Sequence, residues 1–155
     1  MTLDERFMKE ALRLAEQAAA HGNEPFGAVL VKDDEIVFTN ENQIYSASDP
    51  TYHAEAGLLR NFCAAEHVSN LTDYTLYSSC EPCFMCCGAI VWTKLGRLVY
   101  GASDVDLCAI LGEPGSECCE IVFSRSAHRP QVSAGVLREE SLAILRRYFS
   151  GHKKG

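Results

Sequence analysis

Apolar residues recur along this chain with a changing period, and the changes predict helices that alternate with strands. A first helix is predicted to begin at a capping box between Thr2 and Glu5 and to end near Gly22. The apolar stripe of this helix consists of Phe7, Ala11, Leu14, Ala15 and Ala18.

The middle of the chain has the patterns of a hairpin and of a strand–helix–strand unit. Two short apolar runs, at 26–31 and 36–39, indicate the hairpin. A helix is predicted after His53, and strands at 75–78 and 97–101 enclose a further helix. The helix after His53 carries an apolar face of Ala54, Leu58, Phe62 and Ala65.

The last third of the chain is less regular. It predicts a helix from about Asp104, a loop at 112–115, and a strand either at 121–123 or around Val132. A final helix is predicted over 137–149. Strands that alternate with helices indicate an α/β fold with a mixed sheet covered on both faces.

Composition narrows the class of protein. The 155 residues predict one domain, 1–155, and the contents of 47% hydrophobic and 23% charged residues are typical of a soluble globular protein. The apolar run 85–92 is far shorter than the roughly 20 residues that span a bilayer, so no membrane partner is expected. The acidic N-terminus lacks an apolar signal segment, which favours the cytoplasm. The cysteines outside the motif below are therefore expected to be free thiols.

Two short motifs carry the chemistry. His53-Ala54-Glu55 and Pro82-Cys83-Phe84-Met85-Cys86 together match the H-x-E…P-C-x-x-C signature of zinc nucleobase deaminases. The signature supplies one imidazole and two thiolates, which leave the fourth position of a tetrahedral Zn²⁺ open for water. An open position is what distinguishes a catalytic zinc site from a structural one, so we expect an enzyme.

The spacing of these residues constrains the local structure. Cys83 and Cys86 lie at i and i+3, so both can reach one metal from the start of a helix, with Pro82 at the first helical position. Residues i and i+2 of a regular helix point about 200° apart. His53 and Glu55 can therefore face one zinc-bound water only if His53 precedes the regular part of its helix.

A second reading of the cysteines is a four-cysteine structural zinc site or a redox motif, because Cys80 and Cys83 also form a C-x-x-C pair. Cys80 precedes Pro82 and is expected in an extended segment, aimed differently from the helical pair. The remaining cysteines supply no further C-x-x-C pair, and a structural site has no use for Glu55. The catalytic reading is therefore favoured.

Longer stretches resemble the cytidine deaminase superfamily, in the branch of bacterial guanine deaminases and tRNA adenosine deaminases. These stretches are EPFGAVLVKDDEIV (24–37), DPTYHAE (49–55), TLYSSCEPCFMCCGAIVW (75–92) and GRLVYGA (96–102). The resemblance implies a three-layer α/β/α sandwich on a five-stranded mixed sheet. It also implies one Zn²⁺ per subunit and a homodimer whose interface helps to form each pocket.

The resemblance also assigns roles to individual residues. His53, Cys83 and Cys86 are implied to hold zinc, and Glu55 to act as the general acid and base. The substrate contacts that it implies are Asn42, Phe26 and Trp92. The Ala54 backbone N–H is a further candidate, because an N–H at the start of a helix can hold a ring carbonyl. Glu81 is expected to cap the neighbouring helix rather than to touch substrate.

The chain departs from the family pattern in the segment that contacts the substrate in guanine deaminases. Segment 107–119 lacks the paired aspartates of guanine deaminases and the small-residue segment of the tRNA enzyme, whereas the tail 135–149 looks more like the tRNA enzyme. The net charge of −7 opposes nucleic-acid binding, but residues 124–155 hold seven Lys or Arg against two acids. Arg146, Arg147, Lys153 and Lys154 could meet phosphates, although a solvated helix face is favoured.

Three functions remain open. The leading one is hydrolytic deamination of a free nucleobase or small nucleoside, with guanine as the best single candidate. The second is adenosine-to-inosine editing of tRNA, and the third is a non-catalytic, zinc-stabilised subunit. The intact Glu55 weighs against the third.

Overall fold

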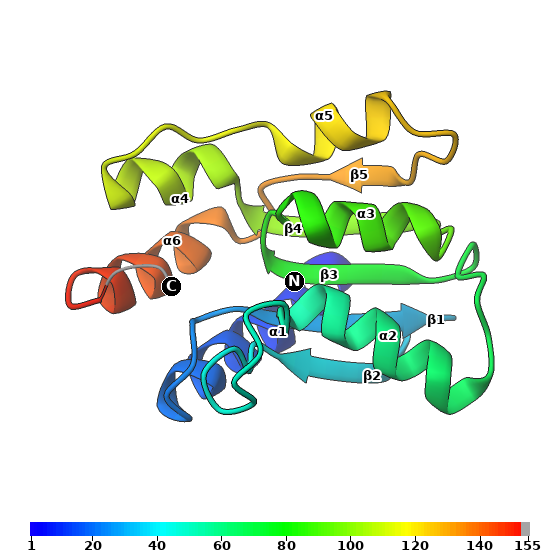
Figure 1. Cartoon of the computed structure of the whole chain (residues 1–155), viewed down its shortest axis with the longest axis horizontal. Helices are drawn as coiled ribbons and strands as arrows, with labels where there is room; N and C mark the ends of the chain where they lie inside the picture. Colours follow the sequence, from blue (N-terminus) through cyan, green and yellow to red (C-terminus); the bar gives the residue numbers. More distant parts are fainter. Residues whose placement is uncertain (153–155) are drawn as a thin grey trace.

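The computed structural model of the protein describes residues 1–152, in which five strands form one sheet in the order β2-β1-β3-β4-β5 (Figure 1). The strands are β1 (Gly27–Lys32), β2 (Glu35–Glu41), β3 (Thr75–Cys80), β4 (Arg97–Ala102) and β5 (Gln131–Ser133). β1 runs antiparallel to both β2 and β3, whereas β3, β4 and β5 are parallel. The sheet is therefore mixed, as predicted.

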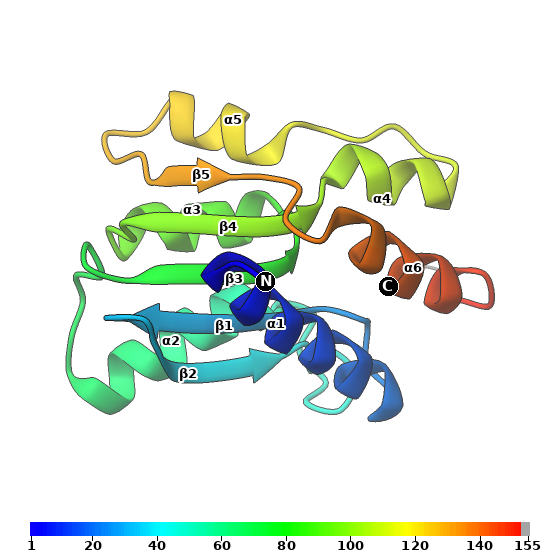
Figure 2. The same cartoon turned by 180° about the vertical axis from the view of Figure 1, so that it is seen from behind.

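Helices cover both faces of this sheet. They are α1 (Leu3–Ala20), α2 (Ala54–Glu66), α3 (Phe84–Trp92), α4 (Asp104–Leu111), α5 (Cys118–Ser124) and α6 (Arg138–Phe149). α2, α3 and α5 lie on one face (Figure 1), and α1 lies on the other (Figure 2). α4 packs against α6 beyond the end of β4. The predicted three-layer α/β/α sandwich is confirmed.

Neighbouring side chains on the central strands point to opposite faces of the sheet and belong to two different apolar cores. On β3, Leu76 packs with α2 and α3 while its neighbour Tyr77 packs with α1. Leu98 and Val99 divide in the same way on β4. Because both faces are covered, these strands are apolar without alternation in the sequence, and each fully buried leucine stabilises the fold by about 1.5–3 kcal/mol.

The first helix begins as predicted. The Thr2 hydroxyl accepts from the Glu5 N–H, and the Glu5 carboxylate accepts from the Thr2 N–H. One turn of α1 is also tied to the sheet, because the Asp4 carboxylate pairs with Arg97 and accepts from the Tyr77 hydroxyl. These contacts fix the first turn of α1 against Tyr77 of β3 and against the first residue of β4.

Of the two positions considered for the fifth strand, the one around Val132 is confirmed, and two other local predictions were wrong. Segment 121–123 is part of α5. Its apolar, β-branched residues suggested a strand, but a helix places Cys119 and Phe123, four residues apart, in the core shared with α3. Ala65 is exposed, because α2 extends past the sheet there, and Pro82 precedes the N-cap of α3 instead of occupying its first turn.

Two predictions about the rest of the chain can be placed. None of the eight cysteines, all of which lie within residues 1–152, forms a disulfide, and Cys80 ends β3 outside the metal-ligating group. Across residues 1–152, no helix is long and apolar enough to cross a membrane. Lys153 and Lys154, considered above as phosphate contacts, lie outside the described residues.

Candidate metal centre and pocket

Two helix N-termini converge beside the carboxyl end of β3. His53 is the N-cap of α2, with φ −75° and ψ 157°, and Cys83 is the N-cap of α3, with φ −70° and ψ 176°. Both residues are extended while their carbonyls already accept the first helical hydrogen bonds, from Gly57 and Cys87. The prediction that His53 precedes the regular helix is confirmed, and Cys83 has the same conformation.

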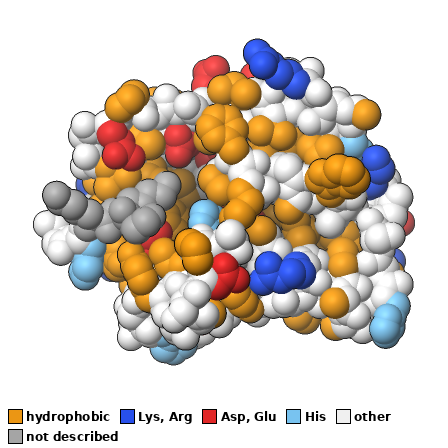
Figure 3. All heavy atoms as spheres, viewed as in Figure 1, with side chains coloured by type: hydrophobic (Ala, Val, Ile, Leu, Met, Phe, Trp, Pro, Cys, Tyr) orange, Lys and Arg blue, Asp and Glu red, His pale blue; other side chains and the backbone are white. Residues whose placement is uncertain are grey.

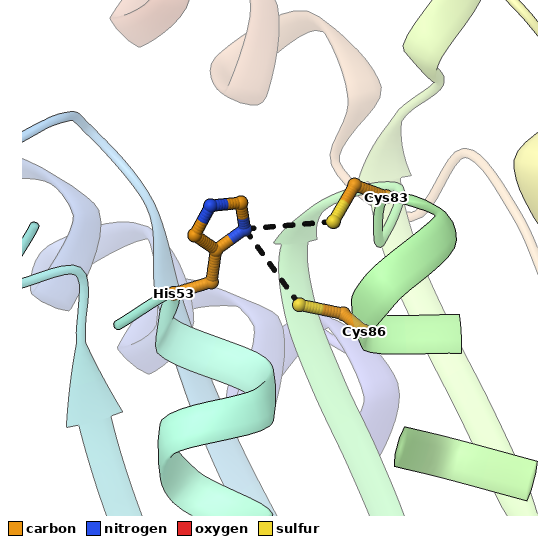
Figure 4. Close-up of side chains that lie close together, drawn as sticks. All are labelled: His53, Cys83 and Cys86. Carbon is orange, nitrogen blue, oxygen red and sulfur yellow. Dashed lines mark hydrogen bonds between the residues drawn. The ribbon is translucent and has the colours of Figure 1, made fainter. Parts of the chain in front are cut away.

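The three predicted metal ligands meet at one point (Figure 4). The Nδ1 atom of His53 lies 3.5 Å from the Cys83 Sγ and 3.7 Å from the Cys86 Sγ. Bond lengths of 2.0–2.1 Å to nitrogen and about 2.3 Å to sulfur place ligands of one tetrahedral zinc roughly 3.5–3.8 Å apart. The imidazole and the two thiols therefore fit one zinc ion, with Nδ1 as the histidine donor.

The electrostatics of the group favour a thiolate. A hydrogen bond from Cys86 lowers the pKa of Cys83, and His53 lowers it further. The pKa of Cys86 is raised in turn, chiefly by the same hydrogen bond and by burial. One thiol of the pair is thus ionised readily, which is the form that binds metal.

Glu55 lies one residue into α2, next to this group. Its side chain is 6% exposed, and burial raises the pKa of the Glu55 carboxyl to about 7, with a further contribution from the charge of Cys83. A carboxyl with a pKa near neutrality can both accept and return a proton at physiological pH. The position and environment of Glu55 therefore suit a general acid and base.

A small pocket opens onto the metal group. Its walls consist of Glu24, Phe26, Asn42, His53, Glu55, Glu81, Cys83, Asp104 and Leu107. Phe26 also packs against the end of α6, where its ring centroid lies 6.4 Å from that of Phe149. The C-terminal helix therefore supports one wall of the pocket.

The structure brings two of the four predicted substrate contacts to the wall of this pocket. Phe26 and Asn42 line it, and Asn42 is held by its Oδ1, which accepts from the Ile44 N–H at 3.1 Å. Ala54 is fully buried beside it, and its carbonyl accepts from Asn40. Trp92 does not line the pocket: it lies at the far end of α3 and is 84% exposed.

Other pocket residues were missed or misplaced by sequence reasoning. Glu24, Asp104 and Leu107 were not singled out, since Glu24 lies in an ordinary turn sequence and the other two in the segment that departs from the family pattern. Glu81 does not cap α3. Its two carboxylate oxygens accept from the backbone N–H groups of Asp104 and Cys119, at 2.9 and 3.0 Å, and so join the first turns of α4 and α5.

Comparison with known proteins gives a consistent picture. Residues 1–102 match the family model for the cytidine and deoxycytidylate deaminase zinc-binding region. The chain is 41% identical over 154 residues to a tRNA-specific adenosine deaminase of Haemophilus influenzae. This match covers 97% of this chain and 86% of that protein. It is 42% identical over 103 residues to guanine deaminase of Bacillus subtilis, which covers 66% of each chain.

Solved structures of both kinds are also similar. A tRNA:A34 deaminase superimposes with a TM-score of 0.77 at 32% identity, covering 90% of this chain and 98% of that one. A guanine deaminase from Nitrosomonas europaea superimposes with a TM-score of 0.80 at 26% identity, covering 94% and 84%.

Proposed function

Because this chain belongs to the cytidine and deoxycytidylate deaminase family, we propose that it hydrolytically deaminates a free purine base, with guanine as the leading candidate. The observation that carries this choice is the wall of the pocket, in which the carboxylates of Glu24, Glu81 and Asp104 stand beside Phe26 and Asn42. A pocket of this charge suits a neutral ring with N–H donors and repels a phosphate.

In this proposal His53, Cys83 and Cys86 hold the zinc ion, which supplies a bound water of lowered pKa. Glu55 would take one proton from the attacking water and give it to the ring nitrogen, and would then move a second proton from the hydroxyl group added to the ring carbon to the amine, which leaves as ammonia. The ring lies against Phe26, and the Asn42 amide orients its polar edge. The packing of Phe26 against Phe149 of α6 shields this side of the pocket, and so the ring, from bulk water.

Adenosine-to-inosine editing of tRNA is the second candidate. It is favoured by the similarity to tRNA-specific adenosine deaminases over nearly the whole chain. A groove beside the end of α6, lined in part by Arg147, Tyr148 and His152, offers cationic and aromatic side chains to a nucleic acid. The net charge of −7 and the acidic pocket weigh against this candidate.

Ammonia release separates the candidates. Zinc-loaded protein is assayed with guanine, adenine, cytosine and their nucleosides, and in parallel for inosine in a tRNA anticodon stem-loop. We expect turnover of guanine or a closely related free base, which is lost in Glu55→Gln. Inosine formation in the stem-loop without turnover of any base or nucleoside overturns the proposal. Bound zinc with no activity on any substrate favours the non-catalytic subunit.

We further propose that the protein is a homodimer that pairs through α3. Phe84, Met85 and Trp92 are 50%, 40% and 84% exposed, and Gly88 between them leaves room for a close approach. Hydrophobic side chains gather on the face of the molecule that carries α3 (Figure 3). Such a patch on a folded chain is typical of an interface.

Sedimentation tests the dimer. Trp92→Glu is expected to give monomer at concentrations at which the wild type is dimeric. The matched control is Leu3→Glu, which places the same charge on an apolar residue of α1 that is 47% exposed. A monomeric wild type, or a dimer that survives Trp92→Glu, contradicts this assignment.

A further inference from the structure

Glu24 is a buried acid that the mechanism above does not use as a catalyst. Only 2% of this residue is exposed, yet it forms part of the pocket wall together with Phe26 and Asn42. A buried carboxylate is costly unless it has partners that offset the loss of water. Its position in the wall of the substrate pocket makes it available to a ligand as well.

The segment that carries Glu24 is held from its N-terminal side. The neighbouring Asn23 is 1% exposed, and its Oδ1 accepts from the N–H groups of Tyr45 and Ser46, both at 3.0 Å. The Asn23 Nδ2 donates to the Ser46 hydroxyl at 3.0 Å. Asn23 thus fastens the segment to the loop after β2, which also contains Asn42.

The same segment is held from its C-terminal side. The Phe26 N–H donates to the Glu24 carbonyl at 2.9 Å, and the Phe26 carbonyl accepts from the Asn42 N–H at 3.0 Å. The Gly27 N–H donates to the Ser79 hydroxyl of β3 at 3.0 Å. The backbone at Glu24 is therefore held in place on both sides. A residue that recognises a ligand by a directed hydrogen bond needs such a fixed position.

Glu24 and Glu55 lie toward different sides of the pocket. Glu24 lies two residues before Phe26, whose ring packs against Phe149 of α6. In the same helix, burial and then the charge of Glu24 raise the pKa of Tyr148. Glu55 lies in the first turn of α2, two residues after the metal ligand His53. Glu24 is thus on the α6 side, whereas Glu55 is on the side of the metal ligands.

We infer that the Glu24 carboxylate accepts a hydrogen bond from a ring N–H of the substrate, and thereby selects free bases over their N-glycosides. This inference rests on the proposed function. When the amino-bearing carbon lies at the metal side, the far edge of a bicyclic base points toward α6. In a free purine this edge carries the N–H of the five-membered ring, and a carboxylate can only accept.

A nucleoside has no such N–H. Its sugar replaces the hydrogen, leaves the buried carboxylate without this donor and needs space that the fixed segment does not yield. Sites built to bond a substrate N–H reject analogues that lack it, by as much as about 10⁴-fold. The nucleotide of a tRNA carries the same substitution and is rejected for the same reason.

The experiment compares kcat/KM for guanine and 9-methylguanine, in wild type, Glu24→Gln and the control Glu35→Gln, an exposed acid on β2. We expect the wild type to prefer guanine by about 100-fold or more. Glu24→Gln is expected to lower kcat/KM for guanine by about 10- to 100-fold, since a bond to a charged acceptor is replaced by a bond to a neutral one. The rate with 9-methylguanine is expected to stay unchanged, so the preference shrinks.

The outcomes separate this inference from the proposal on which it rests. A purely structural role for Glu24 would lower both rates together, and zinc content and the thermal midpoint of each variant report such damage independently. Guanine turnover with the same preference in Glu24→Gln overturns the inference and leaves the proposed function standing. A wild type that deaminates no free base overturns both.

Discussion

The functional site is built mainly from residues 1–102, and residues 103–152 contribute much less to it. The first region contains His53, Glu55, Cys83 and Cys86, and it is also the region that matches the family model. The second region adds α4, α5, β5 and α6 but gives the pocket only Asp104 and Leu107. The metal ligands, Glu55 and most of the pocket wall therefore lie in the first region, and the second region completes and supports that wall.

Buried hydrogen bonds join the two regions. Glu81, next to the metal ligands, accepts from the first turns of α4 and α5. On the opposite side, the Ser141 hydroxyl of α6 donates to the Ser79 carbonyl at 2.6 Å and accepts from the Ala102 N–H at 3.1 Å. These hydrogen bonds let the first region set the positions of α4, α5 and α6.

Substitution of a metal ligand in the first region is expected to have the largest effect. Cys86→Ser is expected to lose both zinc and all deaminase activity, because a hydroxyl is a far weaker zinc ligand than a thiolate. Metal analysis and ammonia release measure the two effects. The control is Cys63→Ser, a half-buried cysteine of α2 outside the metal group, which should keep both. Full activity in a zinc-free Cys86→Ser preparation would refute the metal mechanism.

Glu55→Gln is expected to have the next largest effect. It should lower kcat by about 10²–10⁴-fold while zinc stays bound, because the proton carrier is lost and the ligands are kept. Glu66→Gln, an exposed acid at the end of the same helix, is the matched control and should not change kcat. If Glu55→Gln loses zinc, its effect belongs to the metal site and not to proton transfer.

Ser141→Ala tests a joint between the regions. It is expected to lower the free energy of unfolding by about 1–3 kcal/mol, since the Ser79 carbonyl and the Ala102 N–H each lose a buried partner. Denaturant titration measures the change. The exposed Ser150→Ala serves as the control, and an unchanged midpoint for Ser141→Ala would show that α6 is held by its apolar contacts alone.

The smallest expected effect lies within the second region. Arg138 of α6 donates a hydrogen bond to Asp106 of α4, which joins the two helices. This hydrogen bond lowers the pKa of Asp106 to about 2. Because the folded pKa is below the usual 3.8, this stabilisation is present at neutral pH and is lost as the pH falls from about 4 to about 2.

Asp106→Asn should therefore be slightly less stable than the wild type at pH 7, and the difference should shrink as the pH falls to about 2 and disappear below it. Unfolding curves across this range measure the difference. Arg138→Gln should give the same profile, because it removes the partner of the same carboxylate. A difference that persists below about pH 2 would point to the capping role of Asp106 at the start of α4.

The division also explains what the sequence could predict. The metal ligands followed from the match to the deaminase signature. The extended position of His53 followed from spacing, because helix geometry allows few ways to bring an i, i+2 pair to one point. In the second region, 121–123 has strand-forming residues but folds as part of α5, since burial of Phe123 against the α3 side outweighs local propensity. Glu24 escaped notice because nothing local distinguishes a pocket acid from a turn acid.

Trp92 is the only tryptophan of the chain, and 84% of it faces solvent at the end of α3. Its emission therefore starts near the wavelength of an indole in water and should change little when the fold is lost. It should shift to the blue when another surface covers this end of α3. The protein thus carries an intrinsic optical reporter of association, readable by dilution without any label.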